Sequence, residues 1–517
     1  MYPVGIPSSV EAFLSTGIAG QLLIAFILLF FILSLCSCLM DEQYQDPAMP
    51  VPLPEHSLFT ILPFFHQRFD FLNWGFRATG QPIFQFRLFR NTVIAVSGEA
   101  SRRTFLTSKG LDLNEGFKYL SGSIPVVPGV TSNITSRHVS IVRKRLAVAQ
   151  REERLQALIP ELLLDCQRVM ESWGVSGSCD PFKNIYELLF QISVRSLTCS
   201  EIADDSAVVA RLQKLYDTLD RWNTPAAVLF PWLPSPGAVF KLLATKQIYG
   251  VVCGAINARQ QSGISRNDML QILLDHEDEH LVVVGFIMGL LVAGARATGA
   301  TASWMITFLG CHSDWKVKAA AEIQSLISTH SSSSSTPSST SHLQNLSERL
   351  STIPVCAWES STPILDAIIR ETLRLAEPHT AMRRNLGPEV QFGDKVVPTG
   401  AFVLYQFSDV HLDERIYPNP WEFDPGRSTD SKVPFSWIGW GAGKTVCLGQ
   451  RLAKLELKLI AAMFLLGMDF DIVDRSGKHM ATPPRPNWND TLLCQPQNGS
   501  FKLRFQQTPS PRLDGVI

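Results

Sequence analysis

The stretch that decides the fold is Trp437 to Leu455, WIGWGAGKTVCLGQRLAKL. It joins a glycine-rich loop to one cysteine, Cys447, and continues into a segment where leucines recur every three or four residues from Leu448 to Leu459. That spacing is typical of an amphipathic helix. A cysteine just before a helix lies near free backbone N–H groups and the positive end of the helix dipole, and both stabilise a thiolate. Because the thiolate is the form of cysteine that ligates iron, the stretch predicts that Cys447 is a metal ligand.

The GAGKT sequence inside this stretch also invites comparison with a phosphate-binding loop. That motif requires a glycine five positions before Gly443, where the chain has Ile438. The phosphate-loop interpretation therefore fails. Gly439, Gly441 and Gly443 instead remove side chains where a flat macrocycle would have to approach the backbone, so the loop suits haem.

The loop resembles the haem-binding loop of the cytochrome P450 family. The residues taken to follow the family pattern FxxGxGxRxCxG, with an aromatic substitution at its first position, are Trp437, Trp440, Gly441, Gly443, Cys447 and Gly449. The resemblance implies that Cys447 is the thiolate ligand of a haem iron and that Gly441 and Gly443 form part of the cofactor site. The chain departs from the pattern at Thr445, where the family has arginine, and Lys444 beside it is the candidate replacement for a contact to a haem propionate.

Two further motifs of this family occur in the expected order. Glu371 and Arg374 lie three residues apart in ETLRL, a spacing that alone indicates only a surface ion pair, and FDPGR ends at Arg427. The resemblance implies that these three residues form a buried Glu-Arg-Arg network. Arg383, in AMRRN, is either a solvated charge or an arginine that pairs a haem propionate, and we choose the second interpretation.

The segment 281–310 is apolar nearly all round, but Arg296 in its middle argues against a membrane span and for a helix through the protein core. The family pattern AGx(D/E)T(T/S) falls on residues 293–298, where Arg296 replaces the acid and Ala297 the first threonine. Thr298 is the remaining alcohol and our candidate catalytic residue for proton delivery. Its alternative role is a hydroxyl bonded to its own helix backbone, in which case water, the substrate or Thr301 would carry the protons.

The N-terminal region predicts a membrane anchor. After a short segment, 1–16, the range 17–40 contains about 18 uncharged residues, enough to cross most of a bilayer core. A cleaved signal peptide is the alternative, but the run is long and is preceded by Glu11 without Lys or Arg. The proline-rich range 41–56 predicts a stiff, extended linker before the catalytic body, 57–517. Flanking charge does not give the orientation, because the first Lys or Arg is Arg68.

Along the body, the sequence predicts two strands around Arg90 and Asn91, a helix ending at Gly110, a helical middle, and a late hairpin that pairs TLLCQP with SFKLRF around an Asn-Gly turn. The serine-rich stretch 331–341 predicts a solvated loop. The resemblance, from about residue 60 to the end, implies a mainly α fold with a small β-sheet. We expect substrate choice to lie with 113–131, 293–298, the residues near Thr380 and the late hairpin.

Composition limits the remaining function classes. The 517 residues carry a net charge of −1, with 45% hydrophobic and 18% charged residues, a balance that gives no sign of nucleic-acid binding. Ten scattered cysteines indicate a reducing compartment rather than a disulfide framework. The resemblance to microsomal members of the family implies a cytosolic body, so we expect the four Asn-x-Ser/Thr sequons, which begin at Asn133, Asn345, Asn489 and Asn498, not to be glycosylated.

The resemblance to fungal, microsomal cytochromes P450 of specialised metabolism implies the function. A monooxygenase of this kind binds haem b, takes electrons from NADPH through NADPH-cytochrome P450 reductase, and inserts oxygen from O2 into a small hydrophobic substrate, with a terpenoid as the expected class. It implies a single-pass anchor in the endoplasmic reticulum membrane, with membrane lipid as a partner and the catalytic domain in the cytosol. Two alternatives remain: a haem-thiolate isomerase or dehydratase that needs no O2, and a non-catalytic haem-binding membrane protein.

Overall fold

The computed structural model describes residue 28 and residues 46–54, 57–120, 136–229, 235–331, 341–428, 432–496 and 501–508. Apart from Leu28, the expected anchor lies outside these residues. So do most of the serine-rich stretch, residues 121–131 of the expected substrate loop, and the Asn-Gly turn at 498–499. In the described part of the expected linker, residues 46–49 form a turn, in which the Met49 N–H donates to the Asp46 carbonyl at 2.8 Å. Only Val51 and Pro52 are extended as a strand, and they pair in parallel with the strand that begins at Ile83.

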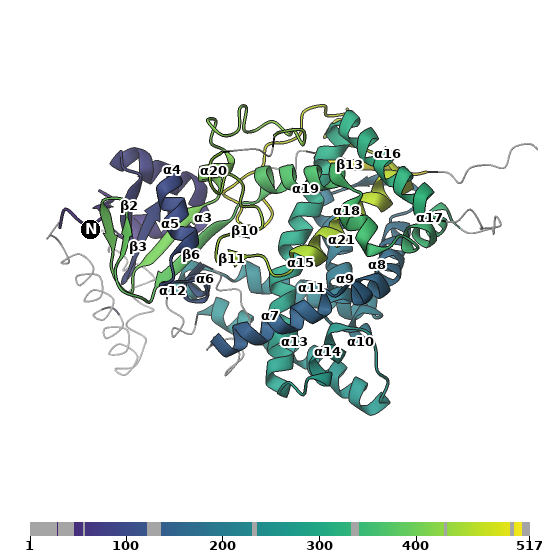
Figure 1. The fold of residues 1–517 in the computed structure, drawn as a ribbon. Coiled ribbons are helices and arrows are strands. Elements are labelled where there is room, and N and C mark those ends of the chain that lie inside the picture. The colour runs from purple at the N-terminus through teal and green to yellow at the C-terminus, as the bar shows by residue number, and fades with distance from the viewer. Residues whose placement is uncertain are drawn as a thin grey trace, which may run out of the picture.

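A six-stranded sheet occupies one end of the molecule (Figure 1). Its order is β1-β2-β3-β9-β6-β4, with bounds Val51–Pro52, Ile83–Leu88, Asn91–Val96, Phe402–Gln406, Thr380–Asn385 and Leu111–Asp112. The predicted strands around Arg90 and Asn91 are confirmed as the β2–β3 hairpin, which is paired from Ile83–Val96 to Leu88–Asn91. α3 (Ser57–His66) and α4 (Arg68–Thr79) cover this sheet and share an aromatic cluster with it. The predicted helix that follows is α5 (Glu99–Thr107), and it ends three residues before Gly110.

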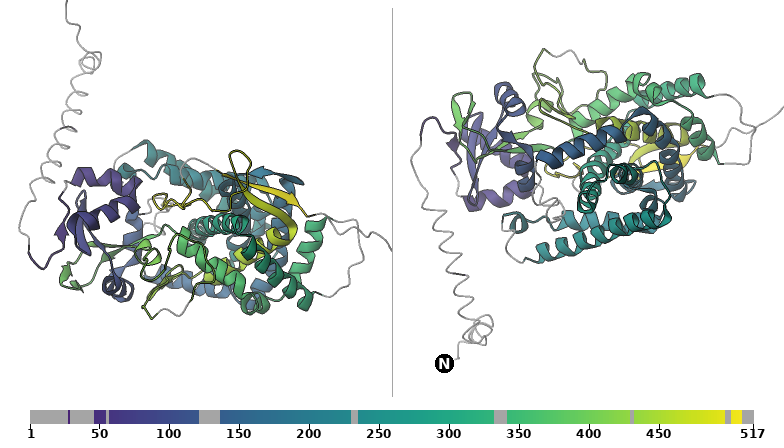
Figure 2. Two further views of the ribbon diagram at one scale, coloured as in Figure 1. Left: turned by 90° about the horizontal axis from the view of Figure 1, so that it is seen from above. Right: turned by 60° about the horizontal axis from the view of Figure 1, so that its bottom comes forward.

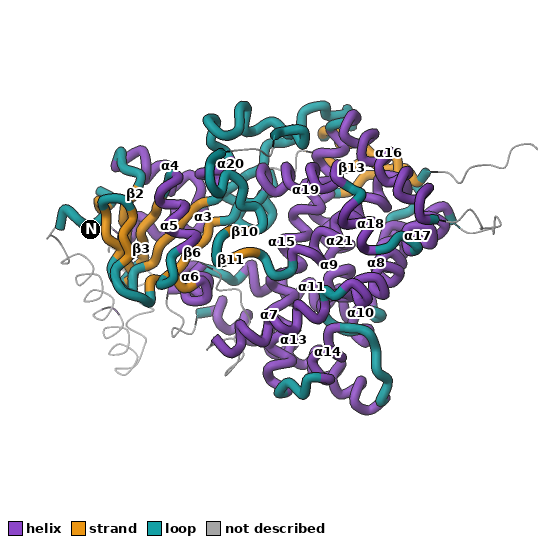
Figure 3. Tube along the Cα trace, viewed as in Figure 1, coloured by secondary structure: helices purple, strands orange, loops and turns teal. Residues whose placement is uncertain are grey.

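Helices form the rest of the body, as Figure 3 shows by colour. The helices before the central one are α6 (Leu113–Leu120), α7 (Ser136–Ala149), α8 (Glu152–Ser172), α9 (Pro181–Leu197), α10 (Ser200–Ala203), α11 (Ser206–Arg221), α12 (Pro225–Leu229), α13 (Pro236–Ser262) and α14 (Met269–Asp275). Those after it are α16 (Ser313–His330), α17 (His342–Ser351), α18 (Val355–Ser360), α19 (Pro363–Ala376), α20 (Ser408–His411) and α21 (Gln450–Gly467). The predicted mainly α fold with a small β portion is confirmed, although the start of the expected 113–131 loop is the helix α6.

The central helix, α15 (His280–Cys311), is the predicted core helix. Every residue from Thr298 to Cys311 is buried. Within the described residues, α13 and α15 are the two helices long and apolar enough to cross a membrane. α15 passes through the middle of the body, where α9, α13, α19 and α21 pack around it. The neighbouring helices of the protein therefore cover the apolar surface of α15.

The predicted late hairpin is wrong. Residues 491–496 form turns and irregular backbone rather than a strand. β13 (Phe501–Gln507) instead pairs with β12 (Met468–Asp474) on one side and β5 (Ser176–Cys179) on the other. These strands lie at the opposite end of the body from the six-stranded sheet (Figure 2). The Asn-Gly turn signal correctly indicated the strand β13. Its partner is β12, whose alternating apolar residues form a longer strand than residues 491–496 could.

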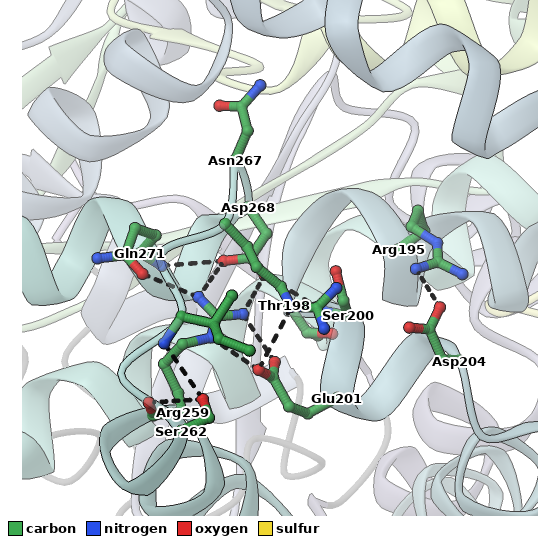
Figure 4. Close-up of polar contacts among 12 residues, drawn as sticks. Arg195, Thr198, Ser200, Glu201, Asp204, Arg259, Ser262, Asn267, Asp268 and Gln271 are labelled. Atoms are coloured by element: carbon green, nitrogen blue, oxygen red, sulfur yellow. Dashed lines mark hydrogen bonds and ion pairs between the residues drawn. The ribbon is translucent and has the colours of Figure 1, made fainter.

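A buried ion-pair network ties α13 and α14 to the short helix α10 (Figure 4). Arg259 donates to both carboxylate oxygens of Glu201 at 2.7 Å, and to Asp268 at 2.5 and 3.2 Å. Gln271 accepts a further bond at 3.0 Å. Burial lowers the pKa of Arg259, but the bonds from the two acids outweigh it and raise the pKa overall. Every charge in this network therefore has a partner of opposite sign.

Candidate active site

Cys447 follows a tight hairpin made of β10 (Gly441–Ala442) and β11 (Thr445–Val446). Its backbone N–H donates to the Trp440 carbonyl at 2.7 Å, which fixes the cysteine at the exit of the loop. The helix α21 begins three residues later, as predicted. Its buried leucine stripe starts at Leu452, whereas Leu448 precedes the helix and is exposed, which corrects its place in the predicted stripe.

Two glycines of the loop are required by the chain itself. Gly441 and Gly443 have φ values of +74° and +62°, which side chains rarely adopt. A Cβ at Gly441 would overlap the Thr445 carbonyl, and one at Gly443 would overlap the Leu106 carbonyl. The loop is therefore shaped by its own backbone before any cofactor approaches it.

The Cys447 thiol is exposed, yet burial raises its pKa above the ordinary value. The two observations agree if the sulfur faces a space inside the protein that solvent reaches but protein surrounds. The Gly449 N–H lowers the pKa, which is the expected effect of the helix start, but burial outweighs it. A bound cation would reverse that balance, because a coordinating thiol is deprotonated outright. Metal ligation at Cys447 remains a prediction.

The structure brings Glu371, Arg374 and Arg427 together. Arg374 makes a bidentate pair with Glu371, at 2.7 and 2.9 Å, and Arg427 Nε donates to the same carboxylate at 3.0 Å. Glu371 and Arg374 are 4% and 0% exposed, so this is a buried pair and not the surface pair that the spacing alone indicates.

This network also reaches the cysteine loop. Arg374 donates to the carbonyls of His411 and Pro420, both at 2.7 Å. The His411 ring then accepts the N–H of Ile438 at 3.1 Å. Burial, with Arg374 second, holds the pKa of His411 well below its usual value, so the ring stays neutral and can accept that bond.

Counting back from Cys447 also places Ile438, rather than Trp437, at the first position of the loop pattern.

Arg383 lies on β6 with its guanidinium against the cysteine loop. It is 2% exposed, and it donates to the Phe105 carbonyl and to the Thr445 hydroxyl. No described carboxylate pairs with it, and its buried Nε has no partner. Burial lowers the pKa of Arg383 to about 10. A buried cation that faces the loop without an acid fits an anionic group of a cofactor, and Thr445 lies where the loop pattern has an arginine.

Lys444 is less well placed than Arg383. Its side chain is exposed, and its backbone N–H donates to the Leu106 carbonyl at 3.1 Å. No described acid pairs with its ammonium. Lys444 therefore remains a candidate propionate contact through a flexible side chain, whereas Arg383 is held in position.

On α15, Ala293 and Ala297 are exposed although they lie in a helix packed on all sides. Residues four apart share a helix face, so this face borders an interior space. Thr298 and Arg296 flank Ala297 on opposite sides, each about 100° away around the helix. The Thr298 hydroxyl makes no hydrogen bond with any described residue, whereas the Thr301 hydroxyl donates to the Ala297 carbonyl at 2.9 Å. Back-bonding, the alternative considered for Thr298, therefore applies to Thr301.

Arg296, at the position of the missing acid, pairs with Asp220 of α11. Both residues line a cleft of about 470 Å³ between α9, α11, α15 and residues 492–495. Burial raises the pKa of Asp220 to about 6, and Arg296 opposes that shift. The charge at this motif position therefore points away from the alanine face and toward α11.

Three residues near this site were not found from the sequence. Glu377 and His379 follow α19, and Arg68 begins α4. Glu377 has a buried Oε2 without a partner, and burial raises its pKa well above the usual value. Glu377 and His379 lie close to Thr380, in a stretch that we expect to take part in substrate choice. Their ionisable side chains were the signal that could have identified them. Arg68 lies more than 300 residues earlier and gave none.

The comparisons with known proteins agree with this geometry. The cytochrome P450 family model matches residues 177–503. A cytochrome P450 monooxygenase of Aspergillus novofumigatus, nsrP, is 31% identical over 78% of this chain and 80% of its own length. AacuE, a cytochrome P450 monooxygenase of Aspergillus aculeatus, is 28% identical over 80% of this chain and 84% of its own. The retinoic acid-bound cyanobacterial CYP120A1 shares the fold, with a TM-score of 0.67 at 23% identity over 89% of this chain and 99% of its own.

The protein is therefore a haem-thiolate oxidoreductase, and the chain belongs to the cytochrome P450 family. Its relatives are named monooxygenases, so it is a monooxygenase of the same kind. Membership also implies haem b as cofactor and a redox partner that supplies electrons.

Proposed function

We propose that this monooxygenase inserts one oxygen atom from O2 into a small, largely apolar fungal secondary metabolite, with a terpenoid as the favoured class. Electrons would come from NADPH through NADPH-cytochrome P450 reductase. The observation that carries the cofactor assignment is Arg383, whose buried and acid-free guanidinium lies against Thr445, two residues before Cys447. When bound, haem b would supply the redox chemistry that activates O2, and a thiolate from Cys447 would favour cleavage of the O–O bond.

The residues of the chain divide the remaining work. Cys447 would provide the thiolate, Arg383 and secondarily Lys444 would pair the propionates, and the backbone of Gly441 and Gly443 would keep the loop narrow. Glu371, Arg374 and Arg427 would position the loop, through the carbonyl and ring of His411. The alanine face of α15 leaves room for an apolar substrate.

Thr298 is the proposed proton donor, because its buried hydroxyl is free of its own backbone. Thr298→Ala should lower the amount of product formed per NADPH consumed. Without a positioned proton donor, electrons from NADPH are consumed without oxidising the substrate. Thr301→Ala is the matched control, because its hydroxyl already donates to Ala297 and should leave this ratio unchanged. Equal ratios for both variants would remove Thr298 from the mechanism.

Membrane attachment is supported by an apolar patch in addition to the expected anchor. Val239, Phe240, Leu242 and Leu243 are exposed together near the start of α13. Exposed apolar patches of this kind favour a membrane or a protein partner. We place the protein on the endoplasmic reticulum membrane with the body in the cytosol, and protease protection of intact microsomes would test that orientation.

Reductase docking is supported by a second cleft, of about 580 Å³, that Cys447 lines together with Arg451, Lys454 and Lys458. The three cations outnumber the two acids that pair with them, and this excess of positive charge beside Cys447 suits an acidic electron-donating partner. Each of these cations has an acid partner, since Arg451 pairs with Glu359 at 2.5 Å, and Lys454 and Lys458 lie 2.7 and 3.0 Å from Asp366.

The decisive experiment is the reduced carbon monoxide difference spectrum of the membrane fraction. Wild type should show a thiolate-shifted Soret band and Cys447→Ser should not. Absence of the band in haem-replete wild type would contradict the assignment. Arg296 and Ala297 in place of the acid and threonine favour a second candidate, a haem-thiolate isomerase or dehydratase. Product formation without reductase and without O2 would identify that activity.

A further inference from the structure

Arg68, the first residue of α4, is a buried cation without an acid. The residue is 7% exposed, and its Nε donates to the Phe64 carbonyl at 3.3 Å. Its guanidinium carbon lies 4.8 Å from the centre of the Phe64 ring, and no described carboxylate forms an ion pair with it. Burial lowers the pKa of Arg68 to about 10, which still leaves it charged at neutral pH. A desolvated charge with open donors is a strong site for an anion.

The acid closest to Arg68 in sequence serves another partner. Asp70 lies two residues along α4, on a different side of the helix. Its Oδ2 accepts from the Asn489 amide at 2.8 Å, and its backbone N–H donates to the same side chain at 3.1 Å. The carboxylate is therefore used to hold the loop around residue 489 and leaves Arg68 unneutralised.

The start of α4 packs against a loop whose later part, residues 491–496, belongs to the region expected to choose the substrate. Phe69, the residue after Arg68, packs against Trp488 with ring centres 6.0 Å apart. The Trp488 indole donates to the Leu375 carbonyl at the end of α19, at 2.9 Å. The same loop reaches α15, because the Trp304 indole donates to the Leu493 carbonyl at 2.8 Å. This end of α4 is thus joined to both α19 and α15 through one loop.

The charges of Arg68 and Arg383 both act on the ring of His379. Its ring is exposed, yet burial lowers its pKa to about 4, with the charges of Arg68 and Arg383 as the further causes. The ring therefore borders an interior space and stays neutral at physiological pH. The charge of Arg383 acts on the same ring, and Arg383 itself donates to Thr445. Arg68 and Arg383 therefore influence the same histidine ring.

We propose that Arg68 binds an acidic oxygen of the substrate, a carboxylate or an ionised phenol, with His379 as a hydrogen-bonding partner. The inference rests on the proposed function and narrows its substrate class to apolar molecules that carry one acidic group. The alanine face of α15 accepts the apolar part, and Arg68 fixes the end that is not oxidised. A haem propionate offers the same carboxylate chemistry, but Arg383 is the arginine that contacts the loop, whereas the contacts of Arg68 are with α3.

The test is calorimetric titration of the haem-loaded full chain with lauric acid and with methyl laurate, which differ in charge but not in chain length. Wild type should bind laurate at least about tenfold more tightly than the ester, as a charge-assisted contact requires. Arg68→Met should bring the two affinities within about twofold. Arg68→Lys should keep part of the preference. Arg77→Met is the matched control, because Arg77 lies exposed on the same helix and should leave the preference intact.

Each contrary result overturns the proposal. Equal affinities for acid and ester in wild type would do so without any variant, and so would an unchanged preference in Arg68→Met. A lower haem-to-protein ratio in Arg68→Met with the acid preference retained would assign the arginine to a propionate. Failure of the proposed function is separate, because it would show as a missing thiolate Soret band in wild type.

Discussion

Buried arginines occur in two different settings in this molecule. Arg259 is surrounded by Glu201, Asp268 and Gln271, in the network that ties α10, α13 and α14 together (Figure 4). Arg68 and Arg383 are buried to a similar degree, but no described acid pairs with either. The pKa of each arginine depends on whether an acid pairs with it. It is raised at Arg259 and lowered to about 10 at Arg68 and Arg383.

The difference separates charges that hold the fold from charges that await a ligand. Removing a cation from a paired site leaves carboxylates buried alone, which is costly, whereas removing an unpaired cation relieves a desolvation penalty. The same substitution should therefore cost much more stability at a paired site than at an unpaired one. Both unpaired arginines lie on the sheet side of the cysteine loop, and Arg259 lies in the helical part of the body.

The largest effect is expected at the paired site. Arg259→Met should lower the free energy of unfolding by about 3–5 kcal/mol, because Glu201 and Asp268 would lose their buried counter-ion. Urea denaturation of the purified protein would measure it. Arg266→Met is the control, since Arg266 is 44% exposed and lies 3.8 Å from the same Glu201, and it should change stability by less than about 1 kcal/mol. Equal losses for both variants would remove the distinction.

A buried acid without a cation tests the same rule with the opposite charge. Glu456 is 3% exposed, and among the described residues its carboxylate accepts only the Ser196 hydroxyl, at 2.6 Å. Burial raises its pKa to about 7. The pKa of Glu456 in the folded protein is higher than its value of about 4.5 in the unfolded protein. The stabilisation that comes from this difference is therefore fully present below pH 4.5 and is lost as the pH rises through 7.

Glu456→Gln removes that titration. The variant should match wild type near pH 4.5 and become more stable than wild type by about 3 kcal/mol at pH 8.5, at 1.36 kcal/mol per pKa unit. Urea denaturation at the two pH values measures the difference. A stability gap that does not change with pH would show that Glu456 is not titrating in this range.

Arg383→Met should separate stability from cofactor binding. The free energy of unfolding of the haem-free protein should fall by no more than about 1 kcal/mol, because no ion pair is lost. Haem content should fall sharply, since the propionate would lose its buried partner. The haem-to-protein absorbance ratio measures the haem content. Arg384→Met is the control, because the Arg384 side chain is 38% exposed and lies 3.7 Å from the Glu115 carboxylate. A destabilisation as large as that of Arg259→Met would place Arg383 with the structural arginines.

The smallest effect is expected at the Arg296–Asp220 pair, which lines a cleft. The two side chains are 16% and 11% exposed, so solvent weakens their attraction. A double-mutant cycle with Arg296→Met and Asp220→Asn should give a coupling energy of about 1 kcal/mol. A coupling near zero would mean that Arg296 stands alone, like Arg68 and Arg383, and would move it to the unpaired class.

Much of the fold and the centre of the candidate site could be predicted from the sequence, because those features depend on local spacing. The leucine pattern after Cys447 gives α21, and the glycine-rich loop gives the turn before it. Arg296 within an apolar segment was enough to place α15 in the core and not in a membrane. The late hairpin could not be predicted, because the partner of β13 is chosen by packing against β12, which lies more than 25 residues earlier.

What the sequence determined by itself was the identity and order of the chemical groups: one cysteine at a helix start, the Glu371 and Arg374 pair, and a helix without its usual acid. Tertiary structure alone decided which charges have partners. Arg259 meets Glu201 and Asp268 only because α10, α13 and α14 converge, and Arg68 lacks an acid because Asp70 is bonded to Asn489 across the chain. Pairing of a buried charge depends on groups distant in sequence, since a few ångströms decide between an ion pair and a desolvated cation.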